Sequence, residues 1–360
     1  MTAARRQYPP ALWPVKAVQY GRFAGFVCAH VSLRRLPCYS DSTFLYRCPR
    51  QPKGILQIIS IFSIAMADLI ERVISEAGNF FGVACTTTTL VAEACKRHDV
   101  GPLAATALGR ALTGAALLAA LLKDDQSVLL KFEGNGPLRK IITEAGSAGW
   151  VRGYVANPHG ETPLANGRID VASGLGRAGF LTVVKDIGCN TKYPGTIQLY
   201  TSEIGEDLAY YLTQSEQTPS AIGLATRLNR DGTIAAAGGF LIQSLPPADE
   251  PLLARIENQI ATMPPLSTLL CEGKSPSDIL SVLFQDIPHR KTGSSDLYYQ
   301  CSCTRAKMQS ALFSLGREEI SDLLEKEGGA EVCCEFCRQS YLFDKKELEA
   351  LLTIPAKELH

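Results

Sequence analysis

The chain has 360 residues, of which 46% are hydrophobic and 20% charged. This composition excludes a disordered protein, and the length allows about two domains with a sizeable core. The formal net charge is zero, but residues 1–65 carry nine Lys and Arg against one acidic residue, which leaves 27 basic and 35 acidic residues in the rest. Nucleic-acid binding needs clustered basic side chains, so this acidic body argues against nucleic acid as a partner.

Residues 1–65 are basic, contain many aromatic residues and prolines, and show neither a helical nor a strand pattern. We expect them to lie outside the fold. They are either a transit-type presequence or, as we favour, sequence upstream of a true translation start at Met66. The apolar run at 55–65 is too short to span a membrane, so we expect no membrane anchor there.

The next segments have helical spacing. Apolar residues at 69–74 and at 90–95 recur at this spacing and predict two short helices, the first beginning near Met66. Residues 102–122 are apolar on nearly all sides, begin with Pro102 and are interrupted by Arg110. This pattern predicts a buried core helix rather than a membrane span.

From residue 127 the period changes from near four to two. Strands are predicted at 127–133 and 150–158, and the GNGP and AG segments between them mark turns. Further strands are predicted at 179–185, 195–200 and 235–243, with a helix at 206–214. Hairpins with helices grouped beside them predict an α+β core domain of antiparallel sheets at residues 66–246.

A proline-rich exit at 244–250 leads into a segment with two short amphipathic helices, at 252–262 and 277–284. These helices are too short to bury much surface between themselves. We therefore expect residues 247–295 to form a helical linker that needs the surface of the core domain.

Residues 296–360 predict a third, small domain. A strand at 296–300 leads into Cys-Ser-Cys, two helices follow, and a strand at 340–343 precedes a last helix that Asp344 and Glu347 cap. Seven basic and eleven acidic residues between 296 and 354 argue against a zinc ribbon that binds nucleic acid.

Four cysteines of this domain form a split CxC…CxxC set: Cys301, Cys303, Cys334 and Cys337. Two close pairs about thirty residues apart can bring four thiolates to one tetrahedral metal ion, and zinc is the usual occupant. A four-thiolate site is closed, so its role would be structural rather than catalytic, and metal binding would contribute about 10 to 16 kcal/mol to folding. Of the twelve cysteines, those before residue 300 are scattered singly, which indicates a reducing, cytosol-like compartment.

The same spacing lets each pair close as a local disulfide, Cys301 with Cys303 and Cys334 with Cys337, although four cysteines allow three connectivities. Such short loops would not replace the long-range tie of the metal, so oxidation would loosen the domain. The alternative is a zinc knuckle that stays reduced, and a thioredoxin-like site is disfavoured because no βαβ pattern surrounds the CxxC. Cys333 could replace Cys334 as a ligand, but only Cys334 makes a CxxC with Cys337.

Several motifs carry a resemblance to a known family. They are ALGRALTGAALLAALLK at 107–123, FEGNGPL at 132–138, GYVANP at 153–158, SEQTP at 215–219, AAGGFLIQSLP at 236–246 and the final CSC…CEFC. From about Met66 to its end the chain resembles the heat shock protein 33 family of redox-regulated chaperones. The N-terminal extension, Cys271 and Cys333 depart from the family pattern.

The resemblance implies a cytoplasmic chaperone and not an enzyme. The implied zinc ligands are Cys301, Cys303, Cys334 and Cys337, with one Zn²⁺ per chain in the inactive reduced state. Oxidation would form two disulfides, release zinc, unfold the C-terminal domain and the metastable linker, and produce a homodimer. The exposed apolar surface would then hold unfolding client proteins without ATP, for ATP-dependent foldases to refold. The competing hypothesis is a constitutive zinc-knuckle adaptor without redox switching.

Overall fold

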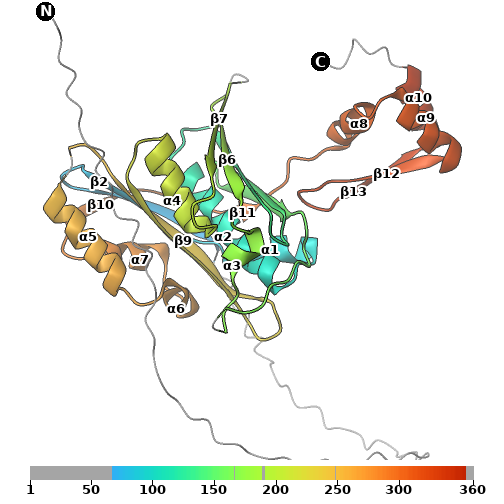
Figure 1. The fold of residues 1–360 in the computed structure, drawn as a ribbon. Coiled ribbons are helices and arrows are strands. Elements are labelled where there is room, and N and C mark those ends of the chain that lie inside the picture. The colour runs from blue at the N-terminus through green and yellow to red at the C-terminus, as the bar shows by residue number, and fades with distance from the viewer. Residues whose placement is uncertain (1–66, 166, 189–190, 248, 354–360) are drawn as a thin grey trace, which may run out of the picture. The chain divides into compact units, whose positions relative to one another are not determined.

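The computed structural model describes residues 67–165, 167–188, 191–247 and 249–353 (Figure 1). The predictions for residues 1–65 and for a start at Met66 lie outside these ranges. The described part is an α+β protein, as predicted, with two large sheets and one hairpin.

The first sheet is antiparallel throughout and has the strand order β10-β1-β2-β9-β8. Its strands are β1 (Leu69–Ser75), β2 (Phe80–Thr86), β8 (Ser220–Leu228), β9 (Ile234–Ser244) and β10 (His289–Asp296). The helix predicted at 69–74 is therefore wrong. Ile70, Val73 and Ile74 are β-branched, and pairing on both sides by β2 and β10 satisfies the backbone that a helix would have satisfied internally.

The second sheet has the order β11-β5-β4-β3-β6-β7. Its strands are β3 (Ser127–Gly134), β4 (Lys140–Gly146), β5 (Trp150–Val155), β6 (Gly179–Asp186), β7 (Lys192–Gln198) and β11 (Tyr298–Tyr299). All neighbours are antiparallel except β11, which pairs in parallel with β5. The chain thus returns from a distant segment to the edge of this sheet just before its first clustered cysteine.

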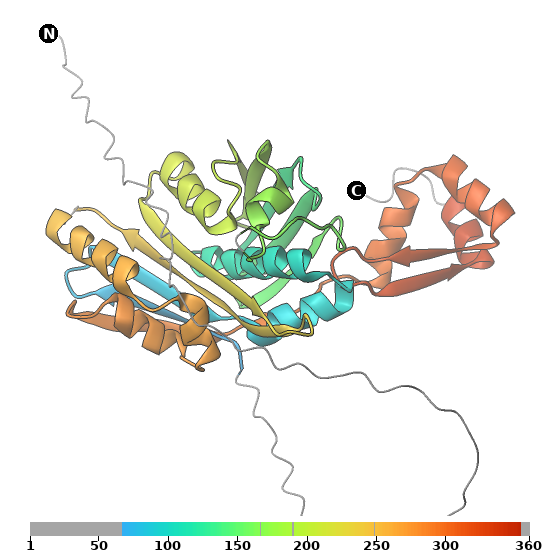
Figure 2. The same ribbon diagram turned by 60° about the horizontal axis from the view of Figure 1, so that its bottom comes forward.

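Helix α2 (Pro102–Ala119) packs against strands of both sheets, and Figure 2 shows it between them. It is long and apolar enough to cross a membrane by length and composition, but 89% of it is buried inside the protein, which confirms the predicted core helix. Glycine lets neighbours approach closely: a Cβ on Gly114 would lie 2.5 Å from Leu208 Cδ1. The remaining helices of this part are α1 (Thr88–His98), α3 (Val171–Leu175) and α4 (Ile204–Ser215).

Three helices follow the core strands and pack on the first sheet (Figure 1). They are α5 (Glu250–Thr262), α6 (Leu266–Cys271) and α7 (Pro276–Leu283). With strands β2 and β9 they enclose a second apolar cluster, which includes Phe80, Phe240, Ile279 and Phe284. Residues 289–295 of the expected helical linker instead lie in strand β10, which pairs with β1 along its length.

The C-terminal segment has its own small core. Its elements are α8 (Arg305–Phe313), α9 (Arg317–Lys326), β12 (Gly329–Cys333), β13 (Ser340–Asp344) and α10 (Lys345–Thr353). Its buried apolar residues are Leu312, Ile320, Phe343, Leu348 and Leu351. The predicted cap is confirmed: the Asp344 amide donates to Glu347 Oε2 and the Glu347 amide donates to Asp344 Oδ1, each at 2.9 Å.

Candidate metal centre

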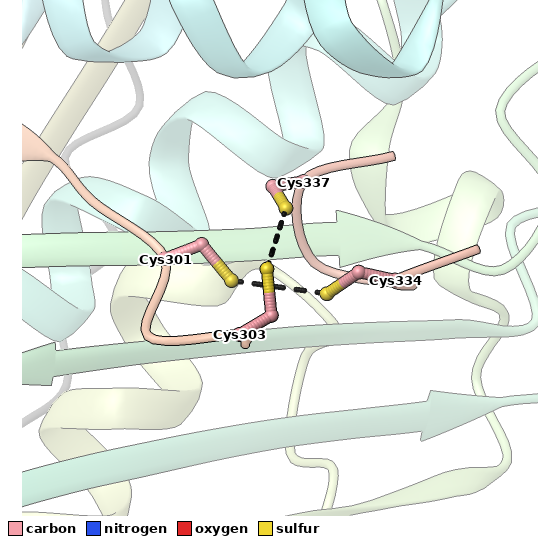
Figure 3. Close-up of side chains that lie close together, drawn as sticks. All are labelled: Cys301, Cys303, Cys334 and Cys337. Carbon is pink, nitrogen blue, oxygen red and sulfur yellow. Dashed lines mark hydrogen bonds between the residues drawn. The ribbon is translucent and has the colours of Figure 1, made fainter. Parts of the chain in front are cut away.

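The four clustered cysteines come from two loops of the C-terminal segment. Cys301 and Cys303 lie between β11 and α8, and Cys334 and Cys337 lie in the turn that joins β12 to β13. Their sulfur atoms are all within 4.8 Å of one another, and Figure 3 shows them pointing toward a common centre. Folding therefore brings together all four residues that the sequence predicted as one site.

The sulfur distances describe four reduced thiols around a metal-sized space. Cys301 Sγ is 3.8 Å from Cys334 Sγ, and Cys303 Sγ is 3.3 Å from Cys337 Sγ. A disulfide would need about 2.05 Å. Four sulfurs at about 2.3 Å from a tetrahedral zinc lie roughly 3.8 Å apart, so the cluster could hold a metal ion with small adjustments.

A tight turn aims the CxxC sulfurs. The Cys334 amide donates to the carbonyl of Gln339 at 3.0 Å, and the Arg338 amide donates to the carbonyl of Cys334 at 2.8 Å. Arg338 has a φ of 60°, in the left-handed region, which reverses the chain directly after Cys337. Cys333 lies one residue earlier, at the end of β12, and is exposed outside the cluster.

The four thiols differ in acidity. Burial raises the pKa of Cys303, but hydrogen bonds from Tyr341 and the neighbouring thiols outweigh it and lower this pKa to about 7. Burial also raises the pKa of Cys334 and of Cys337, and in these two it prevails. Cys303 therefore ionises most readily of these three, and a thiolate is the form that binds a metal or reacts with an oxidant.

An open cavity of about 380 Å³ lies beside the sulfurs. Its lining includes Arg97, Tyr341 and the cysteines Cys301, Cys303 and Cys337. Three of the four clustered cysteines thus border this open cavity.

The Glu335-Phe336 dipeptide inside the CxxC turn rests on the core. The Phe336 carbonyl accepts hydrogen bonds from Tyr299 and, at 2.9 Å, from His98 Nε2 on helix α1. Tyr154 on β5 donates to Glu335 Oε2 at 2.7 Å, and its ring meets the Phe336 ring edge-on, with 5.4 Å between the centroids. The cysteine cluster is therefore assembled against the second sheet and α1.

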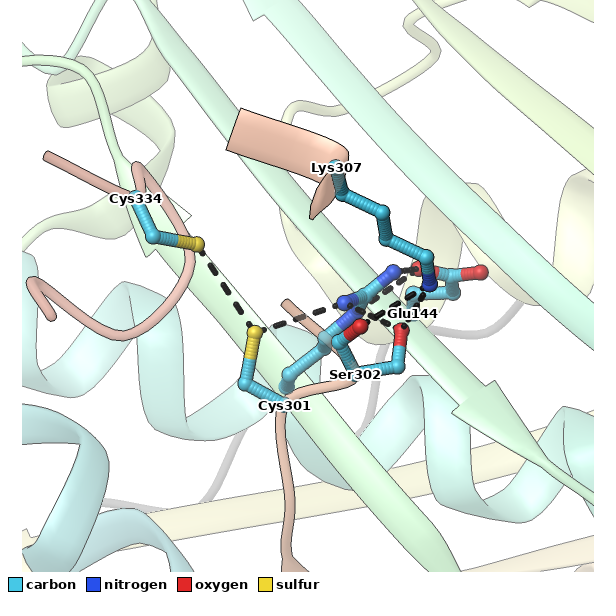
Figure 4. A network of polar contacts seen from close by, with 6 residues as sticks. Glu144, Cys301, Ser302, Lys307 and Cys334 are labelled. Carbon is cyan, nitrogen blue, oxygen red and sulfur yellow. Dashed lines mark hydrogen bonds and ion pairs between the residues drawn. The ribbon is translucent and has the colours of Figure 1, made fainter. Parts of the chain in front are cut away.

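Arg152 on β5 reaches the cluster itself, and Figure 4 shows Cys301, Ser302 and Glu144, with which it makes polar contacts. Its Nη1 donates to Cys301 Sγ at 3.4 Å and to Ser302 Oγ at 3.1 Å. Burial lowers the pKa of Arg152, but Glu144 and Cys301 together raise it above the ordinary value. The sequence indicated only a strand here. Arg152 lies between the buried Val151 and the buried Gly153, and this alternation indicates that its side chain faces away from the core. The alternation does not identify the residue that Arg152 contacts.

The chain is similar to known proteins. The family model described as Hsp33 protein matches residues 68–344. The chain is 62% identical over 287 residues to the 33 kDa chaperonin of Desulfotalea psychrophila, with 80% of this chain and 98% of the relative covered. The 33 kDa chaperonin of Geobacter sulfurreducens is 50% identical over 286 residues, with 79% and 95% covered.

A solved structure is also similar. The crystal structure of the 33 kDa chaperonin from Thermotoga maritima, a heat shock protein 33 homologue, matches with a TM-score of 0.75 and 36% identity. The match covers 79% of this chain and 98% of that one.

Proposed function

Because the chain belongs to the Hsp33 protein family, we propose that it is an ATP-independent holdase chaperone that oxidation of its four-cysteine cluster switches on. The observation that carries the proposal is the convergence of four reduced sulfurs, within 4.8 Å of one another, from two loops about thirty residues apart. The protein would act in a reducing compartment, the cytoplasm, and not as an enzyme.

In the reduced state Cys301, Cys303, Cys334 and Cys337 would hold one zinc ion. When bound, zinc supplies a closed tetrahedral cross-link between the two loops, with no open position for substrate. The donor set fits, because four soft thiolates at these distances match zinc better than a hard cation. This cross-link matters because the described part of the C-terminal segment has a small core of five buried apolar side chains.

In the oxidised state the cluster would form two disulfides, Cys301 with Cys303 and Cys334 with Cys337. Each closes a loop of three or four residues, so neither joins the two halves of the segment. Sulfur contacts of 3.8 and 3.3 Å run between the halves, from Cys301 to Cys334 and from Cys303 to Cys337. Peptide mapping of the oxidised protein under non-reducing conditions distinguishes the local pairing from the crossed one.

The surface released by oxidation would be the second apolar cluster. Along the chain, helices α5, α6 and α7 and strand β10 come directly before β11 and the CxC loop. Phe284 and Leu283 are buried between these helices and the sheet. Loss of the cross-link would free the segment 247–295, and the exposed apolar faces would bind unfolding clients and a second copy of the chain before transfer to ATP-dependent foldases.

The test compares reduced, zinc-loaded protein with protein treated with peroxide at raised temperature. We expect about one zinc per chain to be released, and suppression of citrate synthase aggregation only after treatment. Equal suppression before and after treatment would favour the constitutive zinc-knuckle adaptor, and retention of zinc after full oxidation would contradict the switch. A Cys271→Ser, Cys333→Ser variant, in which the cluster is intact, serves as the matched control.

A further inference from the structure

One core side chain touches both halves of the cysteine cluster. The guanidinium of Arg152 donates through Nη1 to Cys301 and Ser302 of the CxC half, at 3.4 and 3.1 Å. The same guanidinium lies over the ring of Phe336 in the CxxC half, 4.3 Å from its centroid. Arg152 belongs to β5 of the second sheet and not to the C-terminal segment.

Glu144 on the neighbouring strand β4 holds this guanidinium in place. Its Oε2 accepts from Arg152 Nε at 2.9 Å and from Nη2 at 2.6 Å, and the two residues are direct cross-strand partners. The side chains are 15% and 19% exposed. Glu144 therefore engages Nε and Nη2 and leaves Nη1 for Cys301 and Ser302.

We propose that Arg152 is a positioning residue that couples the charge on the Cys301 sulfur to the docking of the C-terminal segment on the core. This inference rests on the proposed function, in which Cys301 is a thiolate in the reduced protein. A thiolate accepts a charge-assisted hydrogen bond from a guanidinium, and such bonds are about twice as strong as neutral ones.

Oxidation removes the negative charge of the Cys301 sulfur whichever of the other three cysteines it pairs with. The Cys301 thiolate and a second thiolate form one S–S bond and give two electrons to a peroxide. The O–O bond of the peroxide breaks, and two hydroxide ions leave. The sulfur of Cys301 is then neutral and a weak acceptor, and among the described residues Arg152 keeps Glu144 and Ser302 as polar partners. Docking of the CxC half and of Phe336 weakens together, since one guanidinium holds both.

A purely structural cross-strand ion pair is the competing explanation, and it makes a different prediction for the metal site. If Arg152 served only Glu144, its replacement would alter the stability of the second sheet and leave the cysteine sulfurs unchanged. The spectrum of a bound metal separates the two explanations, because hydrogen bonding to a thiolate lowers the energy of its lone pairs.

The experiment loads the full chain with Co²⁺ under reducing conditions and compares wild type with Arg152→Met and Arg152→Lys. We expect the sulfur-to-cobalt charge-transfer band to move to longer wavelength in Arg152→Met and by less in Arg152→Lys. We also expect zinc release by peroxide to be about tenfold faster in Arg152→Met, the size that loss of one charge-assisted hydrogen bond implies. Hydrogen exchange at residues 334–338 should rise in the reduced, zinc-loaded variant.

Arg110→Gln is the matched control. Arg110 is also partly buried and pairs with Glu203 at 2.6 Å, away from the cysteines. It should leave the cobalt spectrum, the release rate and the exchange at 334–338 unchanged. If Arg152→Met failed to fold, Arg152→Lys would provide the same readouts.

Spectra and release rates equal to wild type in both Arg152 variants would overturn the coupling while leaving the proposed function intact. Failure of the wild-type chain to bind one equivalent of Co²⁺ or Zn²⁺ would overturn the proposed function itself, and the coupling with it.

Discussion

The Nε2 atom of His98 lies 2.9 Å from the carbonyl oxygen of Phe336, and because a carbonyl can only accept, the imidazole donates this bond. His98 belongs to the core helix α1, whereas Phe336 lies between two of the clustered cysteines. The other ring nitrogen, Nδ1, is buried and has no hydrogen-bond partner among the described residues. A neutral imidazole thus joins the core to the turn that would hold the metal.

This contact predicts a pH dependence of docking. Burial lowers the pKa of His98, the bond to Phe336 opposes this effect, and the charges of Arg338 and Arg97 add to it. Undocked, the imidazole regains its ordinary pKa of 6.5 and binds a proton more readily than when docked. The docked form should therefore lose stability as pH falls below about 6.5, and should not lose it above.

The measurement is hydrogen exchange at residues 334–338 between pH 5.5 and 7.5. We expect His98→Gln, whose amide can still donate, to show a flatter pH profile than wild type. His159→Gln is the control, because His159 is 65% exposed and 3.9 Å from Asp99. Parallel profiles for wild type and His98→Gln would contradict the prediction.

Phe284 should hold the segment 247–295 on the first sheet. It is 1% exposed, and a Cβ added at Gly82 of β2 would lie 2.5 Å from its ring. Phe284→Ala should cost about 3 to 5 kcal/mol, and Gly82→Ala should push the ring outward. In both variants we expect faster proteolysis within 247–295 and suppression of aggregation in the reduced state.

Phe180→Ala provides the comparison for this prediction, because Phe180 is 55% exposed on the second sheet. It should change neither the rate of proteolysis within 247–295 nor the suppression of aggregation. A Phe284→Ala protein that resists proteolysis and does not suppress aggregation when reduced would contradict the proposal that the second apolar cluster covers the client-binding surface.

Replacement of Cys334 should abolish zinc binding, whereas replacement of the adjacent Cys333 should not. Cys334 is 5% exposed with its sulfur 3.8 Å from that of Cys301, whereas Cys333 is exposed outside the cluster. We expect Cys334→Ser to lose zinc at micromolar protein concentration and Cys333→Ser to keep one zinc per chain. The measurement is the zinc content of each variant by atomic absorption. Zinc retained in Cys334→Ser would mean that Cys333 can replace its neighbour, and zinc lost from both variants would contradict the assignment of Cys333 outside the site.

Metal removal should unfold the C-terminal segment selectively. Its small core around Ile320 and Leu348 is separate from the large cluster around α2, and zinc binding contributes about 10 to 16 kcal/mol in comparable modules. After treatment with a chelator and a reductant, amides at 305–353 should exchange freely, while those of α2 stay protected. Loss of protection in α2 as well would show that the two parts unfold as one unit.

Much of the fold and of the cluster was predictable from local patterns. The alternation in 127–133 and 150–158, the apolar character of α2 and the Asp344 cap were all correct, because these elements depend on side chains close in sequence. Strands β8 and β10 were missed, since their polar or small residues show no strict alternation and their pairing partners lie far away in the chain. The same reason made β1 look like a helix.

For the site, the local sequence is enough to specify the chemistry: four thiols in two short-spaced pairs, able to bind one soft metal or to form disulfides. The side chains that surround these thiols depend on the fold. His98, Arg152 and Tyr154 come from elements more than 140 residues before the cluster, and no spacing rule connects them to it. The pairing of β11 with β5 brings these side chains to the cysteines, because it places the start of the C-terminal segment on the edge of the core sheet.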